Sequence, residues 1–126
     1  MELNKKGEAI MPIKNNYWFG TTVTTDSETY WYSEDHNYFL SIEPIMNSFS
    51  KIHLEANRII GAPLFPKWVI IGAETGNRKD KIIPKREWIS AIVENCRECN
   101  VPVFLKSSLK EVWGEPLIQE YPWEKQ

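Results

Sequence analysis

Four short apolar runs, separated by longer polar segments, set the pattern of the sequence. They cover residues 17–24, 38–42, 68–73 and 101–105. Most of their positions are apolar in succession instead of alternating with polar ones, which is typical of strands that are buried on both faces of a parallel sheet. The runs therefore predict four parallel strands.

The segment between the last two runs predicts an amphipathic helix. Its apolar residues recur at helical spacing and form one stripe, made of Trp88, Ile89, Ile92, Val93 and Cys96. Pro84 suits a first-turn position, and Asn100 suits the end of a helix. The opposite face is polar, so this helix would pack one side against the sheet.

A second helical pattern lies between the second and third runs. Ser48 would cap this helix and Gly61 would end it, and its apolar positions are Ile52, Ala56, Ile59 and Ile60. Residues 49–55 also partly alternate, which leaves a strand open there. Residues 26–35, between the first two runs, have room for about three helical turns at most.

A strand, a crossover and a parallel strand, repeated along the chain, predict right-handed βαβ units and an α/β fold. Four such strands make a half-barrel, which is part of a β/α barrel of the TIM type, or a small open sheet. A closed eight-stranded barrel needs ~200 residues or more, and this chain has 126. We expect a flexible leader at 1–14 and a single half-barrel domain at 15–126.

The composition and charge of the chain argue against several classes of function. Lys and Arg number 15 and Asp and Glu 17, for a net charge of −2, so nucleic-acid binding is not indicated. No apolar run reaches the ~18 residues of a membrane span, and the N-terminus does not resemble a signal peptide. Only two cysteines are present, which favours a reducing, cytoplasmic location.

Charged residues follow three of the apolar runs directly. Glu43, Glu74 and Lys106 would stand at the carboxyl ends of neighbouring strands, where ligands bind in parallel α/β folds. Two carboxylates and an ammonium group suit a zwitterionic ligand, with Thr22 and Thr24 as hydroxyl donors. The alternative is a structural Glu–Lys pair that neutralises charges near the core.

Two glycines, Gly72 and Gly76, flank Glu74 directly after the third run. They would let the backbone approach a ligand closely, or they form an ordinary turn. No Gly-Lys-Ser/Thr sequence follows, so a phosphate-binding P-loop is not supported.

The two cysteines form a C-x-x-C pair, Cys96 and Cys99, at the end of the predicted helix. A zinc or iron–sulfur site needs about four ligands, and a redox motif would lie at a helix N-terminus, where thiol pKa values fall. We therefore favour a core position for Cys96 and a helix-end thiol for Cys99 over a metal site.

Two further clusters have open interpretations. Tyr30-Trp31-Tyr32 would form a stacking or partner surface, or else wrap around the sheet edge. A basic cluster follows the third run and is interrupted by Asp80, so we favour a solvated loop over a phosphate site; it comprises Arg78, Lys79, Lys81, Lys85 and Arg86.

The order of the four runs with their flanking residues resembles a phage-type radical-SAM-like domain of unknown function. The matching segments are 18–23, 40–44, 68–76 and 101–106, followed by Trp113-Gly114. The resemblance covers about residues 15–122. It implies a radical-SAM-like β/α barrel, with S-adenosylmethionine and a 4Fe–4S cluster as cofactors.

The departures from that family shape the functional expectation. Its full-length members carry three cluster-binding cysteines, spaced C-x-x-x-C-x-x-C, in an N-terminal half, and this chain has no such motif; the usual Gly-Gly-Glu stands here as Gly-Ala-Glu at 72–74. The resemblance thus implies a C-terminal half that binds no cluster alone, although S-adenosylmethionine remains a candidate ligand.

Such a half would pair with a second copy, as a homo-oligomer, or with a complementing N-terminal half-barrel chain. It would be an enzyme only in that assembly. The alternatives are a non-enzymatic interaction module and an inactive remnant.

Overall fold

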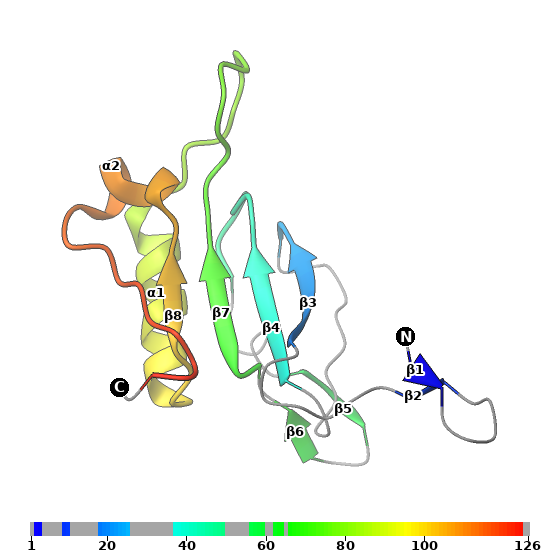
Figure 1. Ribbon diagram of the computed structural model, residues 1–126. Helices are drawn as coiled ribbons and strands as arrows, with labels where there is room; N and C mark the ends of the chain where they lie inside the picture. Colours follow the sequence, from blue (N-terminus) through cyan, green and yellow to red (C-terminus); the bar gives the residue numbers. More distant parts are fainter. Residues whose placement is uncertain are drawn as a thin grey trace.

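The computed structural model describes residues 2–3, 9–10, 18–25, 37–49, 56–59, 62–64 and 66–124. Its centre is a four-stranded sheet whose strands are all parallel (Figure 1). In spatial order these strands are β3 (Trp18–Val23), β4 (Asn37–Ile42), β7 (Trp68–Ile71) and β8 (Val103–Leu105). Each coincides with one of the four apolar runs, which confirms an α/β fold with a four-stranded parallel sheet.

The amphipathic helix is also confirmed, as α1 (Arg86–Glu98). Lys85 is its N-cap residue, so Pro84 precedes the helix instead of occupying its first turn. At the other end Asn100 adopts a φ of 57°. The N–H of Val101 donates to the Cys96 carbonyl at 2.8 Å, and that of Asn100 to the Arg97 carbonyl at 3.3 Å. This pair of bonds is a Schellman motif, with Asn100 as its left-handed residue.

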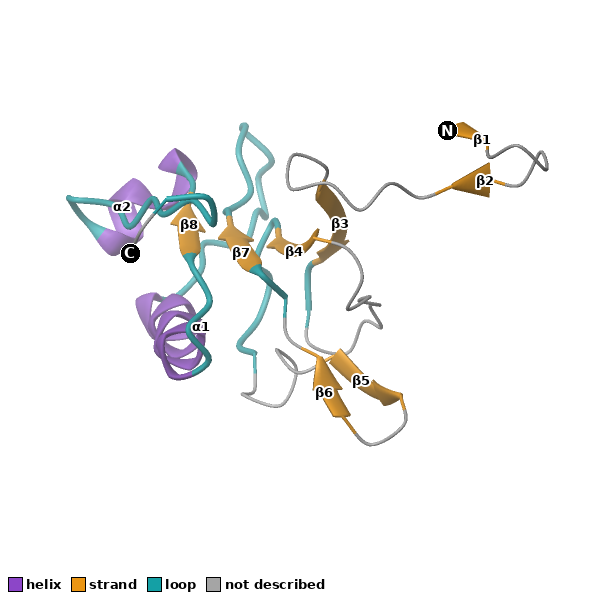
Figure 2. Ribbon diagram, turned by 60° about the horizontal axis from the view of Figure 1, so that its bottom comes forward, coloured by secondary structure: helices purple, strands orange, loops and turns teal. Residues whose placement is uncertain are grey.

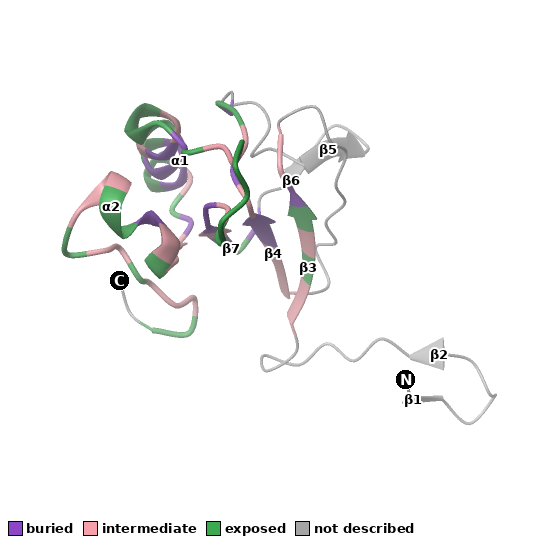
Figure 3. Ribbon diagram, turned by 90° about the horizontal axis from the view of Figure 1, so that it is seen from above, coloured by how far each residue is buried: buried purple, intermediate pink, exposed green. Residues whose placement is uncertain are grey.

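The core lies between α1 and one face of the sheet. Leu40, Val69 and Val103 face it from three adjacent strands and are fully buried, as is Ile89 of α1. In Figures 1 and 2, α1 lies beside β8, and in Figure 3 the buried positions gather on the strands and on the inner side of the helix. The apolar stripe of α1 is therefore the face of the helix that packs against the sheet and is buried in the core.

The opposite face of the sheet differs from the prediction. Burial alternates along β7 and β8, so that Trp68, Ile70 and Phe104 are only half-buried. The expectation of burial on both faces is therefore wrong for these strands, because α1 covers one face only. On the other face Trp68 makes ring contacts at centroid distances of 5.6–6.2 Å with Trp18, Phe39, Phe104, Tyr121 and Trp123.

Two short antiparallel pairs accompany the main sheet. Strands β1 (Glu2–Leu3) and β2 (Ala9–Ile10) pair inside the expected leader. Strands β5 (Ala56–Ile59) and β6 (Ala62–Leu64) pair inside the crossover between β4 and β7.

The second predicted helix is wrong where the structure describes it. Residues 56–59 form a strand, and Ser48 lies outside any helix. Ile59 is β-branched and favours an extended backbone, and β5 pairs antiparallel with β6, with Ile59 opposite Ala62. Residues 26–35 and 50–55, for which other predictions were made, lie outside the described residues.

After β8 the chain forms a short 3₁₀ helix, η2 (Ser107–Leu109), and then α2 (Lys110–Trp113). Residues 117–124, called here the C-terminal strap, then return along β8. The Leu105 N–H donates to the Ile118 carbonyl at 2.7 Å, and the Glu120 N–H donates to the Val103 carbonyl at 2.9 Å. The strap thereby pairs with the outer edge of β8.

Glu120 anchors the strap to α1 and to β8. Both of its carboxylate oxygens accept hydrogen bonds from the guanidinium of Arg97, at 2.7 and 2.9 Å, and one also accepts the Val103 N–H at 3.0 Å. Burial by itself would raise the pKa of Glu120, but the bonds from Arg97 and Val103 outweigh it and hold the pKa below its usual value. The ionised carboxylate is therefore the form that stabilises the fold.

We predict that Glu120→Gln lowers the free energy of unfolding by about 1–3 kcal/mol at pH 7, since a hydrogen-bonded charge is lost. The pKa of Glu120 is lower in the folded than in the unfolded chain, so its contribution is present above the unfolded pKa of ~4.3 and disappears as the pH falls through the folded pKa. Urea unfolding at pH 7 and at pH 3 should show a larger difference between wild type and variant at pH 7. Glu115→Gln is the matched control, because Glu115 pairs with Lys110 at the surface; an equal loss in both variants would contradict the anchoring role.

Candidate functional site

The strand register places four residues in one row at the carboxyl ends of the strands. Val23 pairs with Ile42, Ile42 with Ile71, and Ile71 with Leu105. The residues that follow these partners share one side of the sheet by strand alternation, and they are Thr24, Glu43, Gly72 and Lys106. We call them the carboxyl-end row.

Backbone hydrogen bonds hold this row beyond the ends of the strands. The N–H of Glu43 donates to the Val23 carbonyl at 3.1 Å, and that of Gly72 to the Ile42 carbonyl at 3.0 Å. The N–H of Lys106 donates to the Ile71 carbonyl at 2.9 Å. The side chains of the row are therefore carried on an ordered backbone.

Glu43 and Lys106 form an ion pair, with Lys106 Nζ 2.6 Å from Glu43 Oε2. The two residues belong to opposite neighbours of β7, and Gly72 at the end of β7 leaves room for the carboxylate. A Cβ atom at Gly72 would lie 3.0 Å from the Glu43 carboxyl carbon, closer than side chains pack. The side chains of Glu43 and Lys106 are 33% and 44% exposed, so a ligand can reach both charges.

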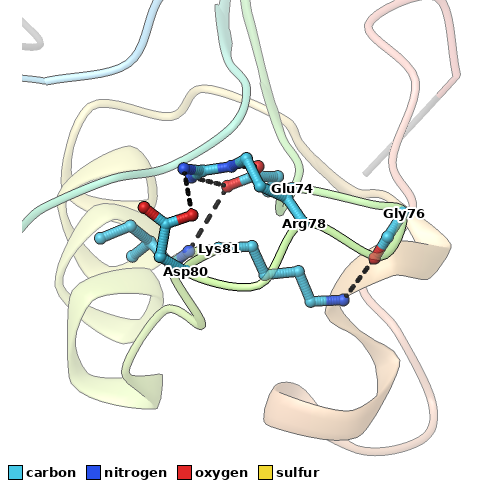
Figure 4. A network of polar contacts seen from close by, with 6 residues as sticks. Glu74, Gly76, Arg78, Asp80 and Lys81 are labelled. Carbon is cyan, nitrogen blue, oxygen red and sulfur yellow. Dashed lines mark hydrogen bonds and ion pairs between the residues drawn. The ribbon is translucent and has the colours of Figure 1, made fainter.

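Glu74 lies in a different cluster, shown in Figure 4. Its two oxygens accept hydrogen bonds from Nε and NH2 of Arg78 at 2.5 and 2.8 Å, and Arg78 also donates to Asp80 at 2.9 Å. The bonds from Arg78 lower the pKa of Glu74, and the same contact raises the pKa of Arg78. Among the described residues no hydrogen bond or ion pair joins Glu74 to Glu43 or Lys106.

The loop that carries Glu74 rises beyond the carboxyl ends of the strands (Figure 1). Gly76 supports its turn with a φ of 92°, and its carbonyl accepts a hydrogen bond from Lys81 at 3.0 Å (Figure 4). The base of the loop is fixed by Ser108, whose Oγ accepts the N–H of Ala73 at 2.9 Å. The loop is thus held by its own polar contacts.

The remaining predicted donors, Thr22 and Thr24, lie on β3 and just after it. Thr22 is exposed and stands in register with Ser41 of β4, while the carbonyl of Thr24 accepts the N–H of Met46 at 3.1 Å. Strand alternation puts both threonines on the side of the sheet that carries Glu43.

Sequence reasoning missed two contacts that shape this end of the sheet. It placed Arg78 in the basic cluster but did not pair it with Glu74, although its spacing four residues after a carboxylate was a usable signal. Ser108 fixes the backbone at Ala73, and nothing in its sequence context indicated that role.

The basic cluster after β7 is largely engaged within the chain. Arg78 pairs with Glu74 and Asp80, and Lys81 bonds to a backbone carbonyl. The guanidinium of Arg86 lies 4.1 Å from the centre of the Trp113 ring and donates to the Trp113 carbonyl. The other cluster of open interpretation, Tyr30-Trp31-Tyr32, lies outside the described residues.

The two cysteines lie in different environments at the end of α1. Burial raises the pKa of Cys96 to about 12, so its thiol stays protonated at neutral pH, and Cys99 lies at the C-cap of α1. Within the described ranges no three His, Cys, Asp or Glu side chains gather as a metal site would require. These residues do not supply the thiolate set of a 4Fe–4S cluster, and no step is assigned to one.

The fold and the carboxyl-end row define the class of the protein. It is a parallel α/β protein with exposed, opposite charges at the carboxyl ends of neighbouring strands, where such folds bind ligands. In the described part of the chain no helix is long and apolar enough to cross a membrane.

The chain belongs to a family described as protein of unknown function (DUF5131), which matches residues 1–119. No curated protein matches the chain significantly, and neither does any solved structure. The family membership confirms a domain of unknown function; the description names no activity, cofactor or source.

The exposure of the Glu43–Lys106 pair distinguishes a binding role from a structural one. We predict a coupling energy of about 0.2–1 kcal/mol in a double-mutant cycle of Glu43→Gln and Lys106→Met, because exposed ion pairs contribute little to stability. Urea unfolding of the four proteins measures it, and the cycle of Lys110→Met and Glu115→Gln gives the surface reference. A loss of about 3 kcal/mol or more on removal of one partner would instead indicate a structural, buried pair.

Proposed function

We propose that the carboxyl-end row binds the zwitterionic end of a small ligand, with S-adenosylmethionine as the candidate, and that the chain is the C-terminal half of a phage-type radical-SAM-like protein. The observation that carries the binding proposal is the ion pair of 2.6 Å between Glu43 and Lys106, formed across Gly72 and open to solvent. The candidate ligand and the type of protein rest on the resemblance of the four motifs.

The chemistry of the pair suits an amino-acid group. The ammonium group of the ligand would bind the carboxylate of Glu43, and the carboxylate of the ligand would bind the ammonium group of Lys106. Two ion pairs with the ligand would then replace the ion pair between Glu43 and Lys106, and the net charge of the site would not change. Separating the pair costs little because both side chains are half-exposed, and each new contact is a charge-assisted hydrogen bond. Gly72 leaves room for the Glu43 carboxylate to reach this position, and the hydroxyls of Thr22 and Thr24 are further donors.

Glu74 acts in this proposal as a positioning residue. Its bonds to Arg78 hold the loop 74–82, which rises beside the carboxyl-end row (Figure 1). Gly76 permits the turn of that loop. A loop held in this way would limit the access of water to a ligand bound on the row.

The open edge of the sheet supports a partner. β3 is the outer strand of the four, and no described strand pairs with its outer edge, whereas the strap pairs with the edge of β8. An unpaired edge is a template for another chain. We propose a second copy of this chain or a complementing half-barrel chain there, with enzymatic activity only in the complemented assembly. Cys96 and Cys99 do not form a disulfide, which supports a reducing, cytoplasmic setting.

A non-enzymatic interaction module is the second candidate function. It is favoured by the exposed apolar side chains of Ile83 and Trp123, which are 69% and 63% exposed. Such a module would depend on these surfaces and not on the charges of the row. An inactive remnant would depend on neither.

Calorimetric titration with S-adenosylmethionine tests the proposal. We expect binding to the wild type and a loss of affinity of about 10-fold or more in Glu43→Gln and in Lys106→Met, since each variant removes a hydrogen bond to a charge. Lys110→Met is the matched control, because it removes an exposed lysine outside the row. Methionine should compete, and its methyl ester, which lacks the carboxylate, should compete poorly.

The outcomes separate the candidates. Binding that survives both Glu43→Gln and Lys106→Met would place the ligand elsewhere. No binding to the wild type at millimolar ligand would contradict a site on this chain and favour the interaction module or the remnant. Weakened binding in Glu74→Gln would support the positioning role of the loop.

A further inference from the structure

A cavity of about 740 Å³ lies at the other end of the sheet, by the amino ends of the strands. Trp18 and Asn37 begin β3 and β4, Lys67 precedes β7, and the strap contributes Trp123. The segment that leaves the end of α1 forms another wall, at residues 99–102. This volume is within the range of about 300–1,000 Å³ that is usual for small-molecule sites. The cavity is separate from the carboxyl-end row, so a ligand bound there is independent of the proposed function.

Two indole rings provide the aromatic surface of this cavity. The rings of Trp18 and Trp123 meet edge to face, with their centroids 6.3 Å apart. Trp123 is held from behind by Tyr121, stacked at 5.2 Å, and by Trp68 at 5.6 Å, yet it remains 63% exposed. A ring that is fixed by its neighbours and open on one side is a platform for stacking a planar ligand.

The charge of the residues that line the cavity indicates the charge of the ligand. Among the ten described residues that line the cavity, Lys67 is the only charged one. Its ammonium donates to Asn37 Oδ1 at 3.1 Å, and its backbone N–H donates to the Tyr38 carbonyl at 2.9 Å, so its position is defined. A fixed cation without an acidic neighbour in the lining favours an anionic group.

We propose that this cavity binds a planar aromatic anion, with the ring stacked on Trp123 beside Trp18 and the anionic group held by the ammonium of Lys67. A nucleoside monophosphate and an aromatic carboxylate share this chemistry. The prolines of the lining, Pro66, Pro102 and Pro122, add rigid apolar walls around the ring.

Cys99 provides a reporter at the wall of the cavity. The residue lines the cavity and is partly exposed, and its Sγ accepts a hydrogen bond from Asn95 Nδ2 at 3.9 Å. The second cysteine of the chain, Cys96, is fully buried, and burial raises its pKa to about 12, so it does not compete for a thiol reagent in the folded protein. Alkylation of the native chain therefore reports on Cys99 alone, and a bound ligand would shield it.

The test measures the rate of Cys99 alkylation by iodoacetamide, read by mass spectrometry, with adenosine monophosphate or indole-3-acetate present. We expect at least one of the two to slow alkylation 5-fold or more at saturation. Adenosine lacks the anion and ribose 5-phosphate lacks the ring, so each should protect far less at equal concentration. If only one of the two anions slows alkylation of Cys99, the result shows whether the cavity prefers a nucleoside monophosphate or an aromatic carboxylate. If neither protects, the proposal is wrong.

Variants locate the protection. Lys67→Met and Trp123→Ala should each raise the ligand concentration needed for half-protection at least 10-fold, and Lys67→Arg should restore most of it. Protection is expressed as the ratio of rates with and without ligand for each protein, which removes changes in the intrinsic reactivity of Cys99, and urea unfolding confirms that each variant is folded. Protection unchanged in both Lys67→Met and Trp123→Ala would overturn the proposal. Lys106→Met separates the two sites, because it alters the carboxyl-end row and leaves the cavity intact.

Discussion

Ile42, Ile71 and Leu105 lie side by side in the parallel register of the sheet, and this register decides where the charges of the chain stand. Because each strand ends at the same level, the residues that follow meet at one edge. Glu43 and Lys106 pair across β7 without strain because Gly72 has no side chain to crowd the Glu43 carboxylate. A shift of one residue in any strand would turn its charged residue to the other side of the sheet.

The two faces of the sheet are stabilised in different ways. One face packs on α1 through aliphatic side chains that are fully buried. The other carries the rings that surround Trp68, which are half-buried and contact the strap. Arg97 and Glu120 join these layers, because they tie the helix on one side to the strap. The strap thus both pairs with the edge of β8 and brings Trp123 to the cavity.

The central strands and α1 could be predicted from the sequence because their signals are local. Continuous apolar runs and a helical stripe specify the elements, and the carboxyl-end position of Glu43 and Lys106 follows from them. The partner of Glu74 was only partly predictable: the i,i+4 spacing of Arg78 was a usable signal, but Lys106 was also available, and only the course of the loop decides between them. The segment 56–59 was misread because Ile59 and Ile60 fit both a helical stripe and a hairpin strand. Trp68 is only half-buried because α1 covers just one face of the sheet. The local sequence pattern does not indicate which face a helix will cover.

The most direct test of the central claim maps the ligand onto the backbone. In a ¹⁵N-resolved NMR titration with S-adenosylmethionine, binding at the carboxyl-end row should shift the amide signals of Gly72, Ala73 and Lys106, because these N–H groups belong to the backbone at the ends of β7 and β8 that adjoins the Glu43–Lys106 pair. The amides of Asn37 and Lys67, at the other end of the strands, should stay in place. Shifts confined to Asn37 and Lys67, or no shifts at millimolar ligand, would contradict the assignment of the site to the carboxyl ends of the strands.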